Sequence, residues 1–242
     1  MKRLILICVF LFLLFTGFID APVQSLKPGS LSLRLRLVFD GKPLNLNNAL
    51  YTDEHGDTLS IDACRFYLSN IVLTNQTQLI YREPYSYHLV DAEDSVSQVI
   101  QLDRVPGGSF SELRFLIGVD SLANVSGAMD GALDPIKGMY WAWNTGYINA
   151  KLTGRSPSCN TLHHAFEFHI GGYLPPCQTL RTVVLKIPVI KPNQEQIVSL
   201  NVDVGTWFTQ VDLHKTNSVL LPCTEAMRLA DNYQRMFSVI TE

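Results

Sequence analysis

Apolar and polar residues alternate along much of the chain. In Leu31–Leu37 every second residue is leucine, and serine or arginine stands between. A period of two is typical of a β-strand that buries one face. The same alternation, or a short apolar run between Gly- and Pro-rich turns, predicts further strands at residues 66–73, 85–90, 99–102, 113–117, 147–152, 163–170, 182–187 and 197–204. Many short strands with few helices predict an all-β fold, an antiparallel sandwich or barrel-like single domain.

One short helix is predicted near the C-terminus, over residues 223–237. Thr224 is suited to cap it, and apolar residues follow at helical spacing as far as Tyr233 and Phe237. We expect this C-terminal helix to bury Tyr233 and Phe237 against the sheet. Residues 119–140 are the longest segment without strong periodicity, and segments of that length often carry function.

The N-terminus has the pattern of a secretory signal. Lys2 and Arg3 precede an apolar run over residues 4–18, which is shorter than the roughly 20 residues of a membrane-spanning helix. We therefore expect residues 1–25 to be a signal peptide and residues 26–242 to form the β-sandwich domain. The mature protein would be periplasmic or extracellular, with no stable membrane anchor after cleavage. The formal net charge of −3 indicates no basic surface for nucleic acid.

Four cysteines follow this N-terminal segment, and an oxidising compartment would allow them to pair. Cys159 and Cys177 flank a predicted strand and are the preferred disulfide. A second disulfide would then join Cys64 to Cys223, and this pairing ranks below the first. Alternatively, Cys64 is a free thiol packed in the core. The sequence has no C-x-x-C pair, which argues against a zinc ribbon.

The densest group of aromatic residues lies in the run Met139–Ile148, which holds two of the three tryptophans. If this run is extended, Trp141 and Trp143 point to the same side. One interpretation is an aromatic core beside a turn, because aromatic side chains dominate cores by buried area. Another is a surface module in which Trp141, Trp143 and Tyr147 form a stacking platform for carbohydrate or another ligand.

Two histidines lie within strand-like segments that are far apart in the sequence. His88 belongs to Tyr85–Val90, and His169 to the alternating segment 163–170. Two imidazoles from neighbouring strands beside a soft or aromatic group would suit copper. The alternative is that each histidine is a half-buried residue satisfied by hydrogen bonds.

Signatures of the common enzyme classes are absent from the sequence, which has no G-x-S-x-G, H-E-x-x-H or Gly-rich phosphate loop. We therefore expect a binding protein and not an enzyme. Asp120, Asp130 and Asp134 share one predicted loop and could bind a hard cation such as calcium. Such aspartates more often accept hydrogen bonds from their own turn backbone, and this interpretation is preferred.

Seven stretches of the chain, spread over about residues 30–240, form an ordered set. They are Phe66–Ile71, Tyr87–Asp91, Gly118–Ser121, Gly131–Pro135, Gly138–Ile148, Phe168–Tyr173 and Asn232–Phe237. In this order they resemble the MbnP family, exported proteins associated with bacterial copper handling and methanobactin operons.

The resemblance implies an exported β-sandwich that binds copper as Cu(I). In the better-known relatives, a partner enzyme of the di-haem cytochrome c peroxidase type oxidises a tryptophan to kynurenine, which joins histidines at the copper site. Carried onto this sequence, the resemblance gives Trp141 and Trp143 as candidates for the modified residue, and His88 and His169 as candidate copper ligands. We expect the rings of the two histidines to approach each other, or to share a cavity, near one of these tryptophans.

Overall fold

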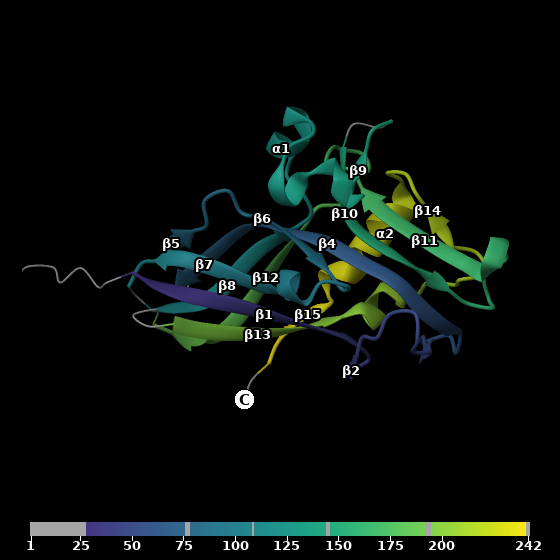
Figure 1. Cartoon of the computed structure of the whole chain (residues 1–242), viewed down its shortest axis with the longest axis horizontal. Coiled ribbons are helices and arrows are strands. Elements are labelled where there is room, and N and C mark those ends of the chain that lie inside the picture. The colour runs from purple at the N-terminus through teal and green to yellow at the C-terminus, as the bar shows by residue number, and fades with distance from the viewer. Residues whose placement is uncertain (1–27, 76–77, 108, 144–145, 192–194, 241–242) are drawn as a thin grey trace, which may run out of the picture.

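The computed structural model describes residues 28–240 except 76–77, 108, 144–145 and 192–194 (Figure 1). The expected signal peptide, residues 1–25, lies outside the described residues. Strands dominate the described part, as the alternation predicts. They are β1 (Gly29–Phe39), β2 (Lys42–Pro43), β3 (Tyr51–Thr52), β4 (Thr58–Asn75), β5 (Gln78–Arg82), β6 (Tyr87–Asp91), β7 (Val99–Val105), β8 (Phe110–Ile117), β9 (Tyr140–Trp141), β10 (Gly146–Arg155), β11 (Ala165–Gly171), β12 (Arg181–Ile190), β13 (Glu195–Asp203), β14 (Ser218–Val219) and β15 (Phe237–Val239).

Helices in the described part are few and short. The two α-helices are α1 (Ser121–Ser126) and α2 (Thr224–Gln234), and the 3-10 turns are η1 (Ser95–Gln98), η2 (Gly131–Leu133), η3 (Pro135–Lys137), η4 (Leu162–His164) and η5 (Val204–Phe208). None of these helices has the length and apolar character needed to cross a bilayer.

The strands form two sheets. The smaller has the order β15-β13-β1-β2, with β7 also paired to β1. The larger has the order β12-β8-β4-β10-β11-β14, with β3, β5 and β6 paired to β4 and β9 paired to β10. The β-sandwich prediction is confirmed, but the sheets are mixed: β1 runs parallel to β13, and β11 runs parallel to β14. Alternation within a strand does not depend on the direction of its partner, so the pattern could not predict this.

Strand β4 organises the larger sheet because its 18 residues pair with five other strands. Phe66 and Leu68 point into the main core, which fills the space between the two sheets. Tyr67 lies between them and points to the opposite face, hereafter the outer face. It is also fully buried, in a second apolar cluster. The outer face of this sheet is therefore covered locally by another part of the chain.

The covering segment is the long aperiodic stretch that follows β8. It folds into α1, η2 and η3, and together with β9 it lies above β6 and β10 at the top of Figure 1. Asp120 caps α1 by accepting from the backbone N–H of Ala123, at 3.1 Å. Asp134 accepts from the backbone N–H of Ile136, at 2.9 Å. These two aspartates confirm the turn-backbone interpretation. Asp130 makes no such cap.

The predicted C-terminal helix is present as α2. Tyr233 is fully buried and Phe237 is 7% exposed, so the expected burial of both is confirmed. The expected C-terminal limit is wrong, because α2 ends at Gln234 and Phe237 pairs with Val202 as a strand. The cap is Cys223 and not Thr224: its Sγ accepts from the backbone N–H of Ala226, at 3.4 Å.

The cysteines in the described residues are Cys64, Cys159, Cys177 and Cys223, and all four are free thiols. The predicted bridge between Cys159 and Cys177 is wrong, because they lie beyond opposite ends of β11. The seven residues of that strand span about 20 Å, whereas a disulfide joins Cα atoms roughly 4.4–6.8 Å apart. Cys64 is a buried core thiol, as the alternative interpretation expected, and burial raises its pKa to about 12.

Candidate functional site

The strand register places the two candidate histidines on opposite faces of the larger sheet. His88 lies opposite Leu68, on the face that carries the main core. His169 lies opposite Lys151, which in turn lies opposite Arg65. Because Arg65 and Leu68 are three residues apart on β4, their side chains point to opposite faces. The expected convergence of His88 and His169 is therefore wrong.

His88 is held by hydrogen bonds at the edge of the sheet. Its Nε2 lies 3.0 Å and 2.9 Å from the two carboxylate oxygens of Glu83. The same carboxylate accepts a hydrogen bond from Ser86, whose hydroxyl oxygen accepts from the backbone N–H of Ile71 at 2.9 Å. These contacts agree with the interpretation of His88 as a half-buried residue satisfied by hydrogen bonds.

His169 has a different environment. Its Nε2 is buried and has no hydrogen-bond partner among the described residues. Burial lowers its pKa to about 4, and the positive charge of Lys151 adds to the effect. The imidazole is therefore neutral near pH 7, with one ring nitrogen left unsatisfied inside the protein. An unsatisfied buried polar atom in a native fold calls for an explanation, and the binding of an ion is one of the usual ones.

Trp141 lies on the same face as His169. Gly171 follows His169 by two residues, so both face outward, about 6–7 Å apart along the strand. A Cβ built on Gly171 would lie 2.5 Å from Cζ3 of Trp141. The indole thus packs on the bare backbone next to His169. Of the expected set, the structure places Trp141 and His169 on one face, with the indole against Gly171, two residues along β11 from His169, and it leaves His88 on the other face.

Trp143 is the exposed neighbour of Trp141. The two ring centroids are 5.5 Å apart with an interplanar angle of 41°. The run is not extended as expected, because β9 ends at Trp141 and a turn follows. Trp141 is 6% exposed and Trp143 is 65% exposed.

Most of the aromatic run is core, as one interpretation predicted. Met139, Trp141 and Tyr147 belong to the second apolar cluster, and Tyr147 is only 1% exposed. The alternative of a three-ring stacking platform is wrong, since Trp143 alone among its three rings is open to solvent. A cavity of about 220 Å³ lies beside Trp141 and Tyr147, and its remaining lining residues are Gly146, Gly172, Tyr173, Leu174 and Pro222.

A row of charged side chains crosses the outer face next to His169. It runs from His169 on β11 through Lys151 and Arg65 to Asp91 on β6. Arg65 Nε lies 2.7 Å from Asp91 Oδ2, and Arg65 Nη2 lies 3.2 Å from Glu93 Oε2. Burial lowers the pKa of Lys151, and the neighbouring Arg65 lowers it further.

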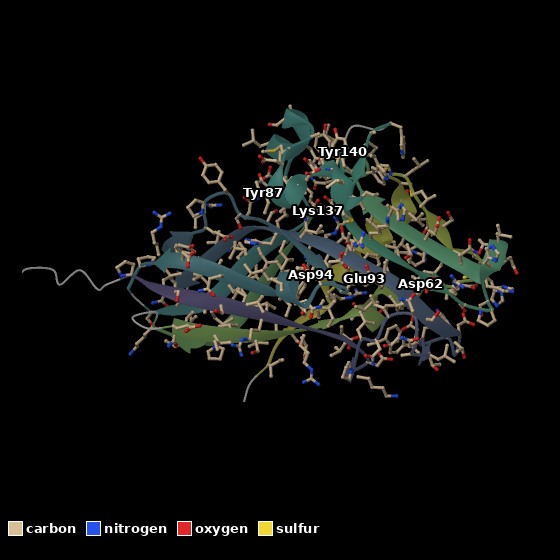
Figure 2. The ribbon with its side chains drawn as sticks, viewed as in Figure 1. Asp62, Tyr87, Glu93, Asp94, Lys137 and Tyr140 are labelled. Atoms are coloured by element: carbon tan, nitrogen blue, oxygen red, sulfur yellow. The ribbon has the colours of Figure 1, made fainter. Side chains whose placement is uncertain are left out.

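His169, Lys151 and Arg65 from this row line a groove of about 440 Å³. Figure 2 shows two of its acidic lining residues, Asp62 and Glu93, with Tyr87, Lys137 and Tyr140 further up the view. Sequence analysis missed Lys151 and Arg65. Each occupies an outward position of an alternating strand, which marks a polar face, but only the pairing of β4, β10 and β11 brings them beside His169.

Comparisons with known proteins agree with this fold. A search of curated proteins finds no match. The solved structure of MbnP from Methylosinus trichosporium matches with a TM-score of 0.60 and 15% sequence identity, over 88% of this chain and 98% of that one. At this identity the match shows a shared fold. The family model described as MbnP matches residues 28–224. Because this match spans most of the sequence, the chain belongs to the MbnP family.

Proposed function

We propose that this protein is exported and binds Cu(I) outside the cytoplasm, as a binding protein of extracytoplasmic copper handling and not as an enzyme. The observation that carries the proposal is the buried, unsatisfied Nε2 of His169 beside Trp141. A neutral imidazole nitrogen is a good ligand for copper. The family relationship supports copper as the metal, since the sequence resemblance implies it.

Without modification, the side chains on this face supply only part of the ligand set that Cu(I) needs. Within the described residues no three His, Cys, Asp or Glu side chains gather as a metal site. One imidazole therefore needs a further donor. Two equivalents of hydrogen peroxide, the oxidant of a peroxidase, would cleave the C2–C3 bond of a nearby indole and be reduced to water. Hydrolysis would then release the formyl carbon as formate and give kynurenine, whose aromatic amine is a nitrogen donor that tryptophan lacks. Trp141 and Trp143 are the indoles on this face, and we propose that one of them is so modified by a partner enzyme of the di-haem cytochrome c peroxidase type.

His88 is not part of the proposed site, because the sheet separates it from His169. It is instead a natural control: it is also half-buried on a strand of the larger sheet, but on the other face. This makes the pair of histidines suitable for a matched experiment.

The test is a Cu(I) titration, by competition with a chromogenic chelator, on protein purified from its native host. His169→Ala is expected to weaken Cu(I) binding by at least about tenfold. His88→Ala is expected to leave the affinity unchanged, provided that circular dichroism shows both variants folded. Equal affinity in the wild type and His169→Ala would refute the proposal, and so would loss of binding in His88→Ala alone.

A further inference from the structure

Cys177 and Cys223 come from distant parts of the chain, and Cys177 and the residue before Cys223 both approach one glycine, Gly172. A Cβ built on Gly172 would lie 2.4 Å from the carbonyl oxygen of Cys177. The same Cβ would lie 3.1 Å from Cβ of Pro222, the residue before Cys223. The loop after β11 and the N-terminus of α2 therefore meet at this glycine.

These two cysteines also differ from the other described cysteines in burial. Cys64 and Cys159 are fully buried in the main core, and burial raises the pKa of the Cys159 thiol to about 11. Cys177 and Cys223 are only partly buried. A thiol must be reached by an oxidant and must ionise in order to react. The two accessible cysteines are also the two whose chain segments meet at Gly172, through the carbonyl of Cys177 and through Pro222.

The meeting point forms one wall of the cavity beside Trp141. Gly172, Tyr173 and Leu174 line this cavity of about 220 Å³, and Pro222 lines it as well. Pro222 is bonded directly to Cys223, and residues 172–174 lie within five residues of Cys177. A covalent link between the cysteines would fix the distance between these two parts of the wall.

We propose that Cys177 and Cys223 form a disulfide that locks this wall of the cavity when the protein meets an oxidising disulfide. The thiolate of one cysteine attacks a sulfur of the external disulfide, forms a mixed disulfide and releases one external thiolate. The second thiolate of the protein then attacks the protein sulfur of the mixed disulfide and releases the other external thiolate. Two protein thiols lose two electrons and two protons, and the external disulfide becomes two thiols.

The probe is oxidised glutathione, added to the purified wild-type protein and to the Cys177→Ser and Cys223→Ser variants. Serine at position 223 still offers an oxygen to cap α2, so this variant keeps the N-terminus of the helix satisfied. After free thiols are alkylated, peptide mapping without reductant is expected to find the peptides of Cys177 and Cys223 joined within one chain. Both variants should lack this joined peptide.

Two further measurements test the effect on the fold. The oxidised wild type is expected to melt about 5 °C or more above its reduced form, because a cross-link restricts the unfolded chain. Backbone hydrogen exchange at Tyr173 and Leu174 should slow on oxidation, and neither variant should show either change. Alkylation of both cysteines after oxidation, glutathione bound to each without a joined peptide, or a link between two chains would overturn the proposal.

Discussion

Trp141 packs on Gly171 so closely that a single added carbon at this glycine would lie 2.5 Å from the indole Cζ3. Real Cβ atoms do not approach neighbours so closely, so a side chain at position 171 must displace the indole. Trp141 is held from the other side by the second apolar cluster, which includes Tyr67 and Leu133. The position of the indole beside His169 therefore depends on the absence of a side chain at Gly171.

Gly171→Ala is accordingly expected to destabilise the protein by about 1–3 kcal/mol, the usual range for overpacking a filled site. It should also shift the tryptophan emission, because the displaced Trp141 becomes more exposed. The proposed function also predicts that Gly171→Ala binds Cu(I) more weakly than the wild type, as His169→Ala does. Chemical denaturation and fluorescence measure the first two effects. An unchanged denaturation midpoint with unchanged emission would show that the indole does not depend on this glycine.

The carboxylate of Asp120 fastens the covering segment to the sheet. It accepts hydrogen bonds from Asn70 Nδ2 at 2.9 Å, from the Tyr87 hydroxyl at 3.0 Å and from the backbone N–H of Ala123 at 3.1 Å. Burial raises the pKa of Asp120, but these hydrogen bonds outweigh burial, and the pKa lies below its ordinary value. The folded state therefore binds the proton of Asp120 less readily than the unfolded state does.

This shift predicts a pH dependence of stability. The contribution of Asp120 is fully present above the unfolded pKa of roughly 3.9 and is lost as the pH falls through the lower folded pKa. Asp120→Ala is expected to cost about 2 kcal/mol at pH 7 and to flatten this part of the acid dependence. The matched control is Asp130→Ala, since Asp130 makes no cap hydrogen bond, and its cost should stay within about 0.5 kcal/mol. Denaturation at pH 7 and at a series of acidic pH values separates the two; equal losses would contradict the role given to Asp120.

The strands and the helix α2 were predictable because their signals are local. Alternation in Leu31–Leu37 reflects one buried face whatever the partner strand is, and it marks β1 correctly. The aromatic character of Trp141 and Tyr147 is also a local signal, but it was compatible with both a core and a surface platform, and only the structure decided for the core. The parallel pairing of β1 with β13 lies beyond such signals, because it joins segments more than 150 residues apart.

The candidate site was predictable only in part, for the same reason. Alternation shows that His169 points away from Phe168 and Ile170, but it does not show whether His88 lies on the same face of the sheet as His169. That depends on the pairing of β6 and β11 with intervening strands, where a shift of one residue would reverse the face. The cysteines failed for a different reason, because the sequence already placed a predicted strand between Cys159 and Cys177. The length of that strand, seven residues in β11, is what keeps the two thiols too far apart to pair.

Export predicts a specific N-terminus for the mature protein. The charged start and the short apolar run over residues 4–18 have the pattern of a cleaved signal. In the native host, N-terminal sequencing should place the first residue of the mature chain between about residues 18 and 28. Recovery of the chain with Met1 in place from the cytoplasmic fraction would refute export.

The proposed oxidation of a tryptophan makes a prediction about which rings change. Trp143 is 65% exposed and Trp141 touches it, whereas Trp207 is fully buried in the main core. Mass spectrometry of protein from the native host should therefore find kynurenine in the peptide from Met139 to Lys151, and an intact Trp207. Protein made in a host without the partner enzyme should keep all three indoles and bind Cu(I) more weakly, because it lacks the aromatic amine as a second donor beside His169. The prediction fails if the two preparations bind Cu(I) equally well, or if Trp207 is oxidised to the same extent as Trp141 or Trp143.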